Sequence, residues 1–313
     1  MIMRRLLPAA LAAILTLSCV VRPGAQAVSA PERVTVTSEG HPMAVWVRRP
    51  ATPRGVVLLL HGRTWSSRPD FDLQVPGMER SVMTALAARG FVTYALDFRG
   101  YGATPRDATG WLTPRRAASD VINVVTWISA QHPTLPRPAI VGWSRGAMVG
   151  MLAAQAVPAR LSALVLFGFV FDPEIEFLDA TAPEQPQRLK NTPAAAMSDF
   201  INPEVAPKVM VDAFVQQAMR ADPVLADLKN DGEFSALKPA RLTVPTLVLF
   251  GDKDPGVPIE DATKFFARLA TPDKQMVSLP GGTHAAQLED THDAWIAAVV
   301  NFLTRPSARR GGS

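Results

Sequence analysis

The stretch "IVGWSRGAMVG", residues 140–150, places a serine between two glycines, where a β-branched apolar run gives way to small, helix-favouring residues. The pattern predicts a strand that leads into Ser144 and a helix that begins directly after it. Gly142 and Gly146 permit a sharp turn and a close approach of neighbouring backbone, which leaves the hydroxyl of Ser144 exposed. The free N–H groups and partial positive charge at the start of the helix would stabilise an oxyanion formed there.

Strand-like and helix-like segments alternate on both sides of this joint. Continuous apolar runs, typical of parallel strands covered on both faces, stand at 55–62, 91–97, 161–171 and 245–251. Helical segments are predicted at 78–89, at 114–132, near 258–269 and at the C-terminal end. Two alternating segments at 33–40 and 42–50 precede them. The alternation predicts an α/β fold with a doubly wound, mostly parallel sheet and antiparallel strands at its start.

One long segment, residues 172–240, interrupts the alternation. It contains no run typical of a buried strand, and eight prolines divide it into short pieces. Its clearest helical face consists of apolar residues at helical spacing: Val211, Phe214, Val215, Ala218 and Met219. Structureless loops of this length are uncommon inside compact domains. We therefore interpret residues 172–240 as a helical lid inserted into a core formed by 28–171 and 241–304, with a flexible basic tail at 305–313.

The first 27 residues have the pattern of an export signal. Arg4 and Arg5 precede an apolar stretch, and Ala-Gln-Ala at 25–27 offers a small-x-small cleavage pattern. The apolar stretch is too short and too soon interrupted to predict a stable membrane span. We expect a periplasmic or secreted protein. "LTLSC" at 15–19 keeps open a lipoprotein anchored through Cys19, although it matches the lipoprotein pattern imperfectly.

Composition excludes several other classes of protein. With 48% hydrophobic and 19% charged residues, the chain can bury a sizeable core. Removal of the three arginines in residues 1–27 lowers the formal charge from +4 to +1, so nucleic acid is not an expected partner. Cys19 is the only cysteine, which leaves the mature chain without a disulfide or thiol nucleophile. No His or carboxylate spacing is typical of a metal site, and we expect no cofactor.

Three further features supply partners for Ser144. "HG" at 61–62 ends a buried strand, where a second oxyanion donor is expected, and the N–H groups of Arg63 and Arg145 are the candidates. Asp254 follows the strand "TLVLFG", and His284 follows "QMVSLPGG". Serine, then aspartate, then histidine is one of the chain orders in which unrelated hydrolases present a catalytic triad.

The motifs "LLLHG", "DFRGYG", "GWSRG", "VLFGDKDP" and "PGGTH", spread over residues 58–284, together resemble those of the α/β-hydrolase superfamily. The resemblance implies a serine hydrolase that forms an acyl-enzyme on Ser144, with His284 as general base and acid and Asp254 orienting it. Relatives use the second aspartate of a G-x-x-D pattern, which favours Asp254 over Asp252. Asp172, after the preceding strand, is a more remote alternative.

The substrate is less well specified than the chemistry. Trp65, Trp143 and Phe169 are candidates to line an apolar pocket, although each could also serve packing alone. The two arginines beside the oxyanion site raise an anionic substrate group as a hypothesis, with surface ion pairing as the alternative. We therefore expect a small-molecule substrate, a carboxylic ester of small to medium apolar character. The sequence does not indicate an oligomeric state.

Other functions on the same fold stay open. Amide, lactone and thioester hydrolysis use the same residues, as does the cofactor-free perhydrolase branch. Epoxide hydrolases and haloalkane dehalogenases are disfavoured, because they place an aspartate at the position of Ser144, and dienelactone hydrolases place a cysteine there. A hypothesis of another class is a ligand-binding protein that kept the fold without catalysis. Complete occupation of the candidate triad positions counts against it.

Overall fold

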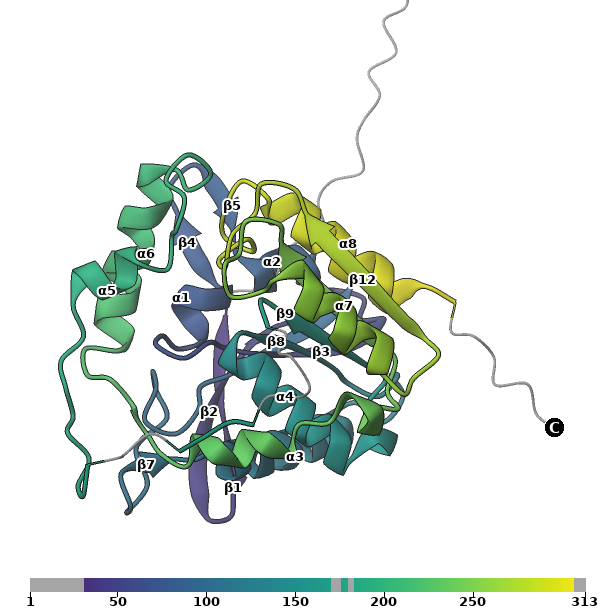
Figure 1. Ribbon diagram of the computed structural model, residues 1–313, viewed down its shortest axis with the longest axis horizontal. Coiled ribbons are helices and arrows are strands. Elements are labelled where there is room, and N and C mark those ends of the chain that lie inside the picture. The colour runs from purple at the N-terminus through teal and green to yellow at the C-terminus, as the bar shows by residue number, and fades with distance from the viewer. Residues whose placement is uncertain (1–30, 170–175, 180–182, 307–313) are drawn as a thin grey trace, which may run out of the picture.

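The computed structural model describes residues 31–169, 176–179 and 183–306, so the predicted signal segment and Asp172 lie outside the described residues (Figure 1). An eight-stranded sheet forms the centre of this part of the chain. In spatial order its strands are β1 (Glu32–Ser38), β2 (His41–Arg48), β6 (Phe91–Leu96), β3 (Gly55–Leu60), β8 (Ala139–Trp143), β9 (Ala163–Phe167), β11 (Thr246–Gly251) and β12 (Lys274–Leu279). Strand β2 is antiparallel to both of its neighbours, and the strands from β6 to β12 pair in parallel. The predicted doubly wound sheet with antiparallel strands at its start is confirmed.

Helices cover both faces of the sheet (Figure 1). One face packs against α3 (Pro114–Gln131), α4 (Arg145–Ala156) and α7 (Ile259–Arg268). The other packs against α1 (Ser67–Phe71), α2 (Val82–Ala87) and α8 (His292–Thr304). The layers place the carboxyl ends of β3, β8, β11 and β12 at one edge of the sheet, where a ligand of an open α/β sheet is expected to bind.

The buried strands explain why continuous apolar runs identify this fold. All six residues of β3 are buried. Val56, Leu58 and Leu60 contribute to the hydrophobic cluster on the α3 and α4 face. Val57 and Leu59 contribute to the cluster on the opposite face. Successive strand side chains point to opposite faces, so a strand covered on both sides must be apolar at every position.

The helix predicted over 78–89 is shorter than expected. Residues Met78–Arg80 form β5, which pairs with β4 (Leu73–Val75) as a small antiparallel ribbon. Helix α2 begins only at Val82, because the side chain of Ser81 caps it by accepting a hydrogen bond from the Thr84 N–H. The capping serine marks the start of the helix more precisely than the apolar periodicity does.

The described part of the segment between β9 and β11 contains two α-helices, two 3₁₀ turns and one short strand. It contains α5 (Pro193–Met197), α6 (Lys208–Ala221) and 3₁₀ turns at Asp231–Ala236 and Pro239–Arg241, while β10 (Asp227–Leu228) pairs with β7 (Trp111–Leu112). Helix α6 packs against α1 and buries Met210, Phe214 and Ala218. Val211, Val215 and Met219 are half-buried against the same cluster. The predicted helical face is therefore confirmed.

The C-terminal boundary of the folded region differs from the prediction. Helix α8 ends at Thr304, and the guanidinium of Arg305 forms an ion pair with Asp273 at 2.7 Å. Arg305 also lies over the ring of Phe302. These contacts place Arg305 with the core and not in the tail to which we had assigned it. None of the described helices is both long and apolar enough to cross a membrane.

Candidate active site

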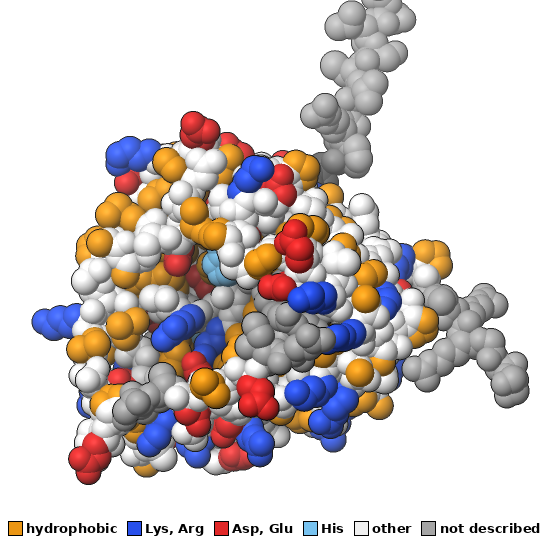
Figure 2. Space-filling model, in the orientation of Figure 1, with side chains coloured by type: hydrophobic (Ala, Val, Ile, Leu, Met, Phe, Trp, Pro, Cys, Tyr) orange, Lys and Arg blue, Asp and Glu red, His pale blue; other side chains and the backbone are white. Residues whose placement is uncertain are grey.

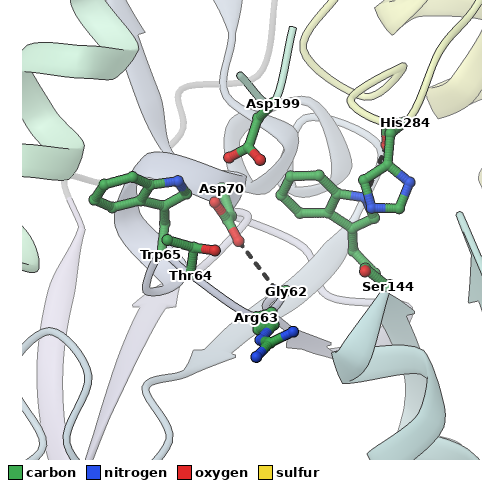
Figure 3. A pocket seen from close by; sticks show the side chains of 9 residues that line it. Gly62, Arg63, Thr64, Trp65, Asp70, Ser144, Asp199 and His284 are labelled. Atoms are coloured by element: carbon green, nitrogen blue, oxygen red, sulfur yellow. Dashed lines mark hydrogen bonds between the residues drawn. The ribbon is translucent and has the colours of Figure 1, made fainter. Parts of the chain in front are cut away.

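Ser144 stands at the sharp turn between β8 and α4. Its backbone has φ 53° and ψ −120°, a conformation that residues other than glycine rarely adopt. A Cβ atom at Gly146 would lie 2.2 Å from the carbonyl oxygen of Leu60, and one at Gly142 would lie 2.5 Å from the carbonyl oxygen of Gly146. Only glycine fits these two positions. The crowded backbone holds Ser144 in its strained conformation, with its side chain facing a cavity (Figure 3).

Asp254 and His284 come from the loops after β11 and β12. The Nδ1 atom of His284 lies 2.8 Å from Oδ2 of Asp254, whose side chain is only 1% exposed. The other carboxylate oxygen of Asp254 accepts a hydrogen bond from the N–H of Gly256. Asp252 instead accepts from the N–H of Gly281, and its side chain is 37% exposed. Asp254, and not Asp252, is therefore the carboxylate that contacts the imidazole.

Two further residues hold the loop that carries His284. The indole N–H of Trp143 donates to the carbonyl oxygen of His284 at 2.8 Å, and their rings lie 5.5 Å apart. The carboxylate of Glu289 accepts hydrogen bonds from the N–H and the hydroxyl of Thr283. Burial raises the pKa of Glu289. Sequence reasoning missed Glu289, because it follows the loop without a motif of its own.

His61 orients the loop that was expected to supply an oxyanion donor. Its Nε2 accepts a hydrogen bond from the N–H of Phe98 at 3.0 Å, so Nδ1 carries the proton and donates to the carbonyl of Gly62. Burial lowers the pKa of His61 to about 3, which keeps the ring neutral. Tyr101 donates its hydroxyl to the carbonyl of Arg63. His61 thus fixes the loop and takes no part in proton transfer at neutral pH.

The two expected oxyanion donors keep free backbone N–H groups. Those of Arg63 and Arg145 donate to no acceptor within the described residues. The guanidinium of Arg145 forms an ion pair with Asp231 at 2.7 Å and lies over the ring of Phe234. This pairing explains the charge of Arg145 without an anionic substrate. The side chain of Arg63 is exposed at the cavity.

Two buried aspartates, Asp97 and Asp222, accept hydrogen bonds from the loops around the site. Asp97 accepts hydrogen bonds from the Trp46 indole and from the N–H groups of Ser67 and Ala103. Asp222, which directly follows α6, accepts from the N–H and hydroxyl of Ser66 and from the N–H of Gly102. The loop of residues 61–67 is consequently anchored both to the core and to the segment between β9 and β11.

A small cavity of about 60 Å³ lies beside Ser144 and His284 (Figures 2 and 3). Its lining consists of Gly62, Arg63, Thr64, Trp65, Asp70, Trp143, Ser144, Asp199 and His284. Trp65 and Trp143 lie where the sequence analysis expects them, and both are almost completely buried. Asp70 and Asp199 were not expected, because neither belongs to a recognisable motif.

Phe169 is not among the described residues that line this cavity. It packs instead against the hydrophobic cluster on the α3 and α4 face of the sheet. The preceding residue, Gly168, has φ +60°, and a Cβ atom there would lie 3.1 Å from the indole of Trp143. The assignment of Phe169 to the substrate pocket is therefore not supported by its position. Within the described ranges, no group of three or more His, Cys, Asp or Glu side chains is arranged to hold a metal ion.

Sequence comparisons with known proteins identify a family and a relative of this chain. The profile of the family described as "Serine aminopeptidase, S33" matches residues 51–291. A monoacylglycerol lipase of Mycolicibacterium smegmatis is 28% identical over 242 residues, which cover 74% of this chain and 81% of that protein.

Solved structures share the fold at lower identity. A hydrolase from Pseudomonas aeruginosa aligns with a TM-score of 0.62 at 22% identity, over 88% of this chain and 98% of that one. The thioesterase domain from the curacin biosynthetic pathway aligns with a TM-score of 0.61 at 17% identity, over 88% and 100%. Both match the arrangement of sheet and helices described above.

Proposed function

The chain belongs to the serine aminopeptidase S33 family of α/β-hydrolases, and from that premise we propose that it hydrolyses carboxylic esters through an acyl-enzyme on Ser144. The observation that carries the proposal is one cavity lined by both Ser144 and His284, with the imidazole bonded to the buried Asp254. The similarity to a monoacylglycerol lipase favours esters over other carbonyl substrates.

The proposed mechanism follows from the hydrogen bonds of His284. Its Nδ1–H donates to Asp254, so Nε2 is left as the proton acceptor. In the proposal, Nε2 takes the proton of the Ser144 hydroxyl as the oxygen attacks the ester carbonyl, and then gives it to the departing alcohol. Water repeats both steps and releases the acid. Asp254 orients the imidazole and stabilises the imidazolium in each half-reaction.

The negative charge that develops on the carbonyl oxygen needs donors. The N–H groups of Arg63 and Arg145 are the proposed pair, because neither donates to an acceptor within the described residues. Arg145 directly follows Ser144, and Arg63 lines the same cavity. Removal of one such donor typically costs about 10²- to 10³-fold in kcat. We also propose that residues 172–240 act as a lid, since Asp199 from this segment lines the cavity.

A fluorophosphonate probe tests the proposed function directly. The purified protein is expected to be labelled covalently and to hydrolyse p-nitrophenyl esters, and Ser144→Ala is expected to abolish both. Ser162→Ala is a matched control, because this serine precedes β9 outside the cavity. A folded protein that neither reacts with the probe nor turns over any ester would contradict the proposal and favour the non-catalytic binder.

We further propose that residues 1–27 direct export and are then removed. The support is the pattern of basic residues, apolar stretch and Ala-Gln-Ala described above. Mass spectrometry of the N-terminal peptide from cells that produce the full chain distinguishes the outcomes. A mature protein that begins at Val28 supports the proposal. One that begins at a lipidated Cys19 supports the lipoprotein alternative, and an intact N-terminus contradicts both.

A further inference from the structure

One wall of the candidate active-site cavity carries two carboxylates that have no role in the proposed ester hydrolysis. Asp70 and Asp199 both line the cavity, together with Trp65 and the nucleophile. Figure 3 shows the two carboxylates facing the same space beside the indole of Trp65. An apolar acyl chain offers no hydrogen bond to these carboxylates, so its binding would leave buried polar atoms without partners.

Asp70 has an acceptor atom that the protein leaves unused. Its side chain is completely buried. Oδ2 accepts a hydrogen bond from the N–H of Gly62 at 3.1 Å, whereas Oδ1 has no partner within the described residues. A buried carboxylate oxygen without a partner costs about 1–3 kcal/mol or more, so a binding group for it is expected. Burial raises the pKa of Asp70 well above its usual range, and the charges of Asp199 and Asp222 act in the same direction.

Asp199 supplies a second carboxylate from a different part of the chain. It follows α5, in the segment between β9 and β11, and is partly exposed. Burial raises the pKa of Asp199 to about 6, while the Trp65 indole and His284 act in the opposite direction. At neutral pH, above the pKa of about 6, Asp199 therefore keeps a negative charge at the cavity.

We propose that Asp70 and Asp199 select substrates whose small acyl group ends in a hydrogen-bond donor, a hydroxyl or an ammonium. This inference rests on the proposed ester hydrolysis and names the substrate class of the same site. The donor would bind Oδ1 of Asp70 and the carboxylate of Asp199, with the ester carbonyl at Ser144. A site built around a hydrogen bond to the substrate rejects an analogue that lacks the donor strongly, because its own polar groups are then left unpaired.

Two features place the acyl group, and not the leaving alcohol, in this cavity. The cavity measures about 60 Å³, well below the 300–1,000 Å³ typical of sites for drug-sized ligands. Two of its lining side chains, those of Trp65 and Asp70, are fully buried. The acyl group stays bonded to the serine through both half-reactions, whereas the alcohol must leave after the first. A small cavity with two fully buried lining side chains therefore fits the part of the substrate that remains.

Three p-nitrophenyl esters of equal size test the inference: butyrate, 3-hydroxypropionate and 3-aminopropionate. The kcat/KM of each, divided by its rate of hydroxide-catalysed hydrolysis, removes differences in intrinsic reactivity. We expect at least one donor-bearing ester to exceed butyrate by about tenfold or more. A larger factor for the aminopropionate identifies a cationic substrate, and a larger factor for the hydroxypropionate identifies a neutral one.

Variants assign the preference to the two carboxylates. Asp199→Asn is expected to bring the ratio of donor-bearing ester to butyrate to within about threefold of one. Asp70→Asn, which keeps an acceptor for the Gly62 N–H, is expected to lower the same ratio. Asp212→Asn is the matched control, because this exposed carboxylate on α6 pairs with Lys208 away from the cavity and its loss leaves the ratio unchanged.

The outcomes separate this inference from the proposed function. Labelling of Ser144 and turnover of butyrate, with wild-type ratios within threefold of one, overturns the inference and leaves ester hydrolysis intact. An enzyme inactive on all three esters overturns the proposed function. In that case, isothermal titration calorimetry of Ser144→Ala with the methyl esters of the same three acids measures whether the two carboxylates favour binding of a donor-bearing acyl group. Equal affinity for butyrate and for both donor-bearing esters then overturns the inference as well.

Discussion

The sheet edge around Ser144 and the segment between β9 and β11 build the same cavity in different ways. Ser144, Asp254 and His284 each follow a strand of the central sheet, and backbone contacts at Gly142 and Gly146 leave the turn at the serine no freedom. The segment that carries α5 and α6 completely buries few side chains and contributes polar groups through its loops. The sheet therefore holds the residues of the proposed reaction in fixed places, whereas the segment between β9 and β11 adds Asp199 to the lining of the cavity.

The largest expected effect separates two aspartates of the sheet edge. Asp254→Asn should lower kcat by about 10³- to 10⁴-fold for every ester, because the imidazole loses the partner that fixes its tautomer. Asp252→Asn should change kcat less than about threefold, since among the described residues its carboxylate bonds to the Gly281 N–H and Lys253 and not to His284. Steady-state kinetics on p-nitrophenyl butyrate measures both. Similar losses in the two variants would contradict the assignment of Asp254.

A second comparison concerns backbone rigidity in the two regions. Gly146→Ala should lower the free energy of unfolding by about 4 kcal/mol or more, because its Cβ would overlap the backbone of residues 60 and 61. Gly232→Ala should cost less than about 1 kcal/mol, since its Cβ meets only the side chain of Asp179 at 3.0 Å. Urea denaturation monitored by circular dichroism gives both values. Equal costs would show that the inserted segment is packed as tightly as the sheet edge.

The smallest expected effect is the pH dependence of stability contributed by Asp199. Burial raises its pKa to about 6 in the folded protein, so folding takes up a proton near pH 5. The stability present below pH 4 is therefore lost as pH rises through 6. Asp199→Asn removes this loss. The free energy of unfolding of the variant, relative to wild type, should therefore be about 1–2 kcal/mol higher at pH 7.5 than at pH 4, allowing for partial exposure. Urea denaturation at the two pH values checks the difference, which should vanish in Asp212→Asn.

The sequence predicts the sheet and the reactive residues for the same physical reason. A parallel strand covered on both faces must be apolar throughout, and the residue at its carboxyl end stands at the functional edge. Runs such as 55–60 and 246–251 therefore locate the strands, and His61, Asp254 and Ser144 follow from the places where such runs end. Glycine spacing around the serine adds the turn, because no other residue fits the backbone contacts.

The rest of the site could not be predicted from local patterns. Asp70 lies in a five-residue helix, and Asp199 lies 129 positions further along the chain, in the segment between β9 and β11. Their meeting in one cavity depends on how α6 packs on α1, which no periodicity specifies. Phe169 is the opposite case: its position after a strand suggested the pocket, but a left-handed turn at Gly168 directs it to the core.

The hydrogen bonds of Asp222 affect how the protein would lose its proposed activity on heating. Its carboxylate holds Ser66 and Gly102 from the end of α6, so the loop beside the reactive serine is braced by the less tightly packed region. Local opening of α6 would release that brace while the sheet stays intact. On heating, the proposed activity would then be lost at a temperature below that at which the sheet unfolds. On cooling, the activity would return once α6 had packed against α1 again.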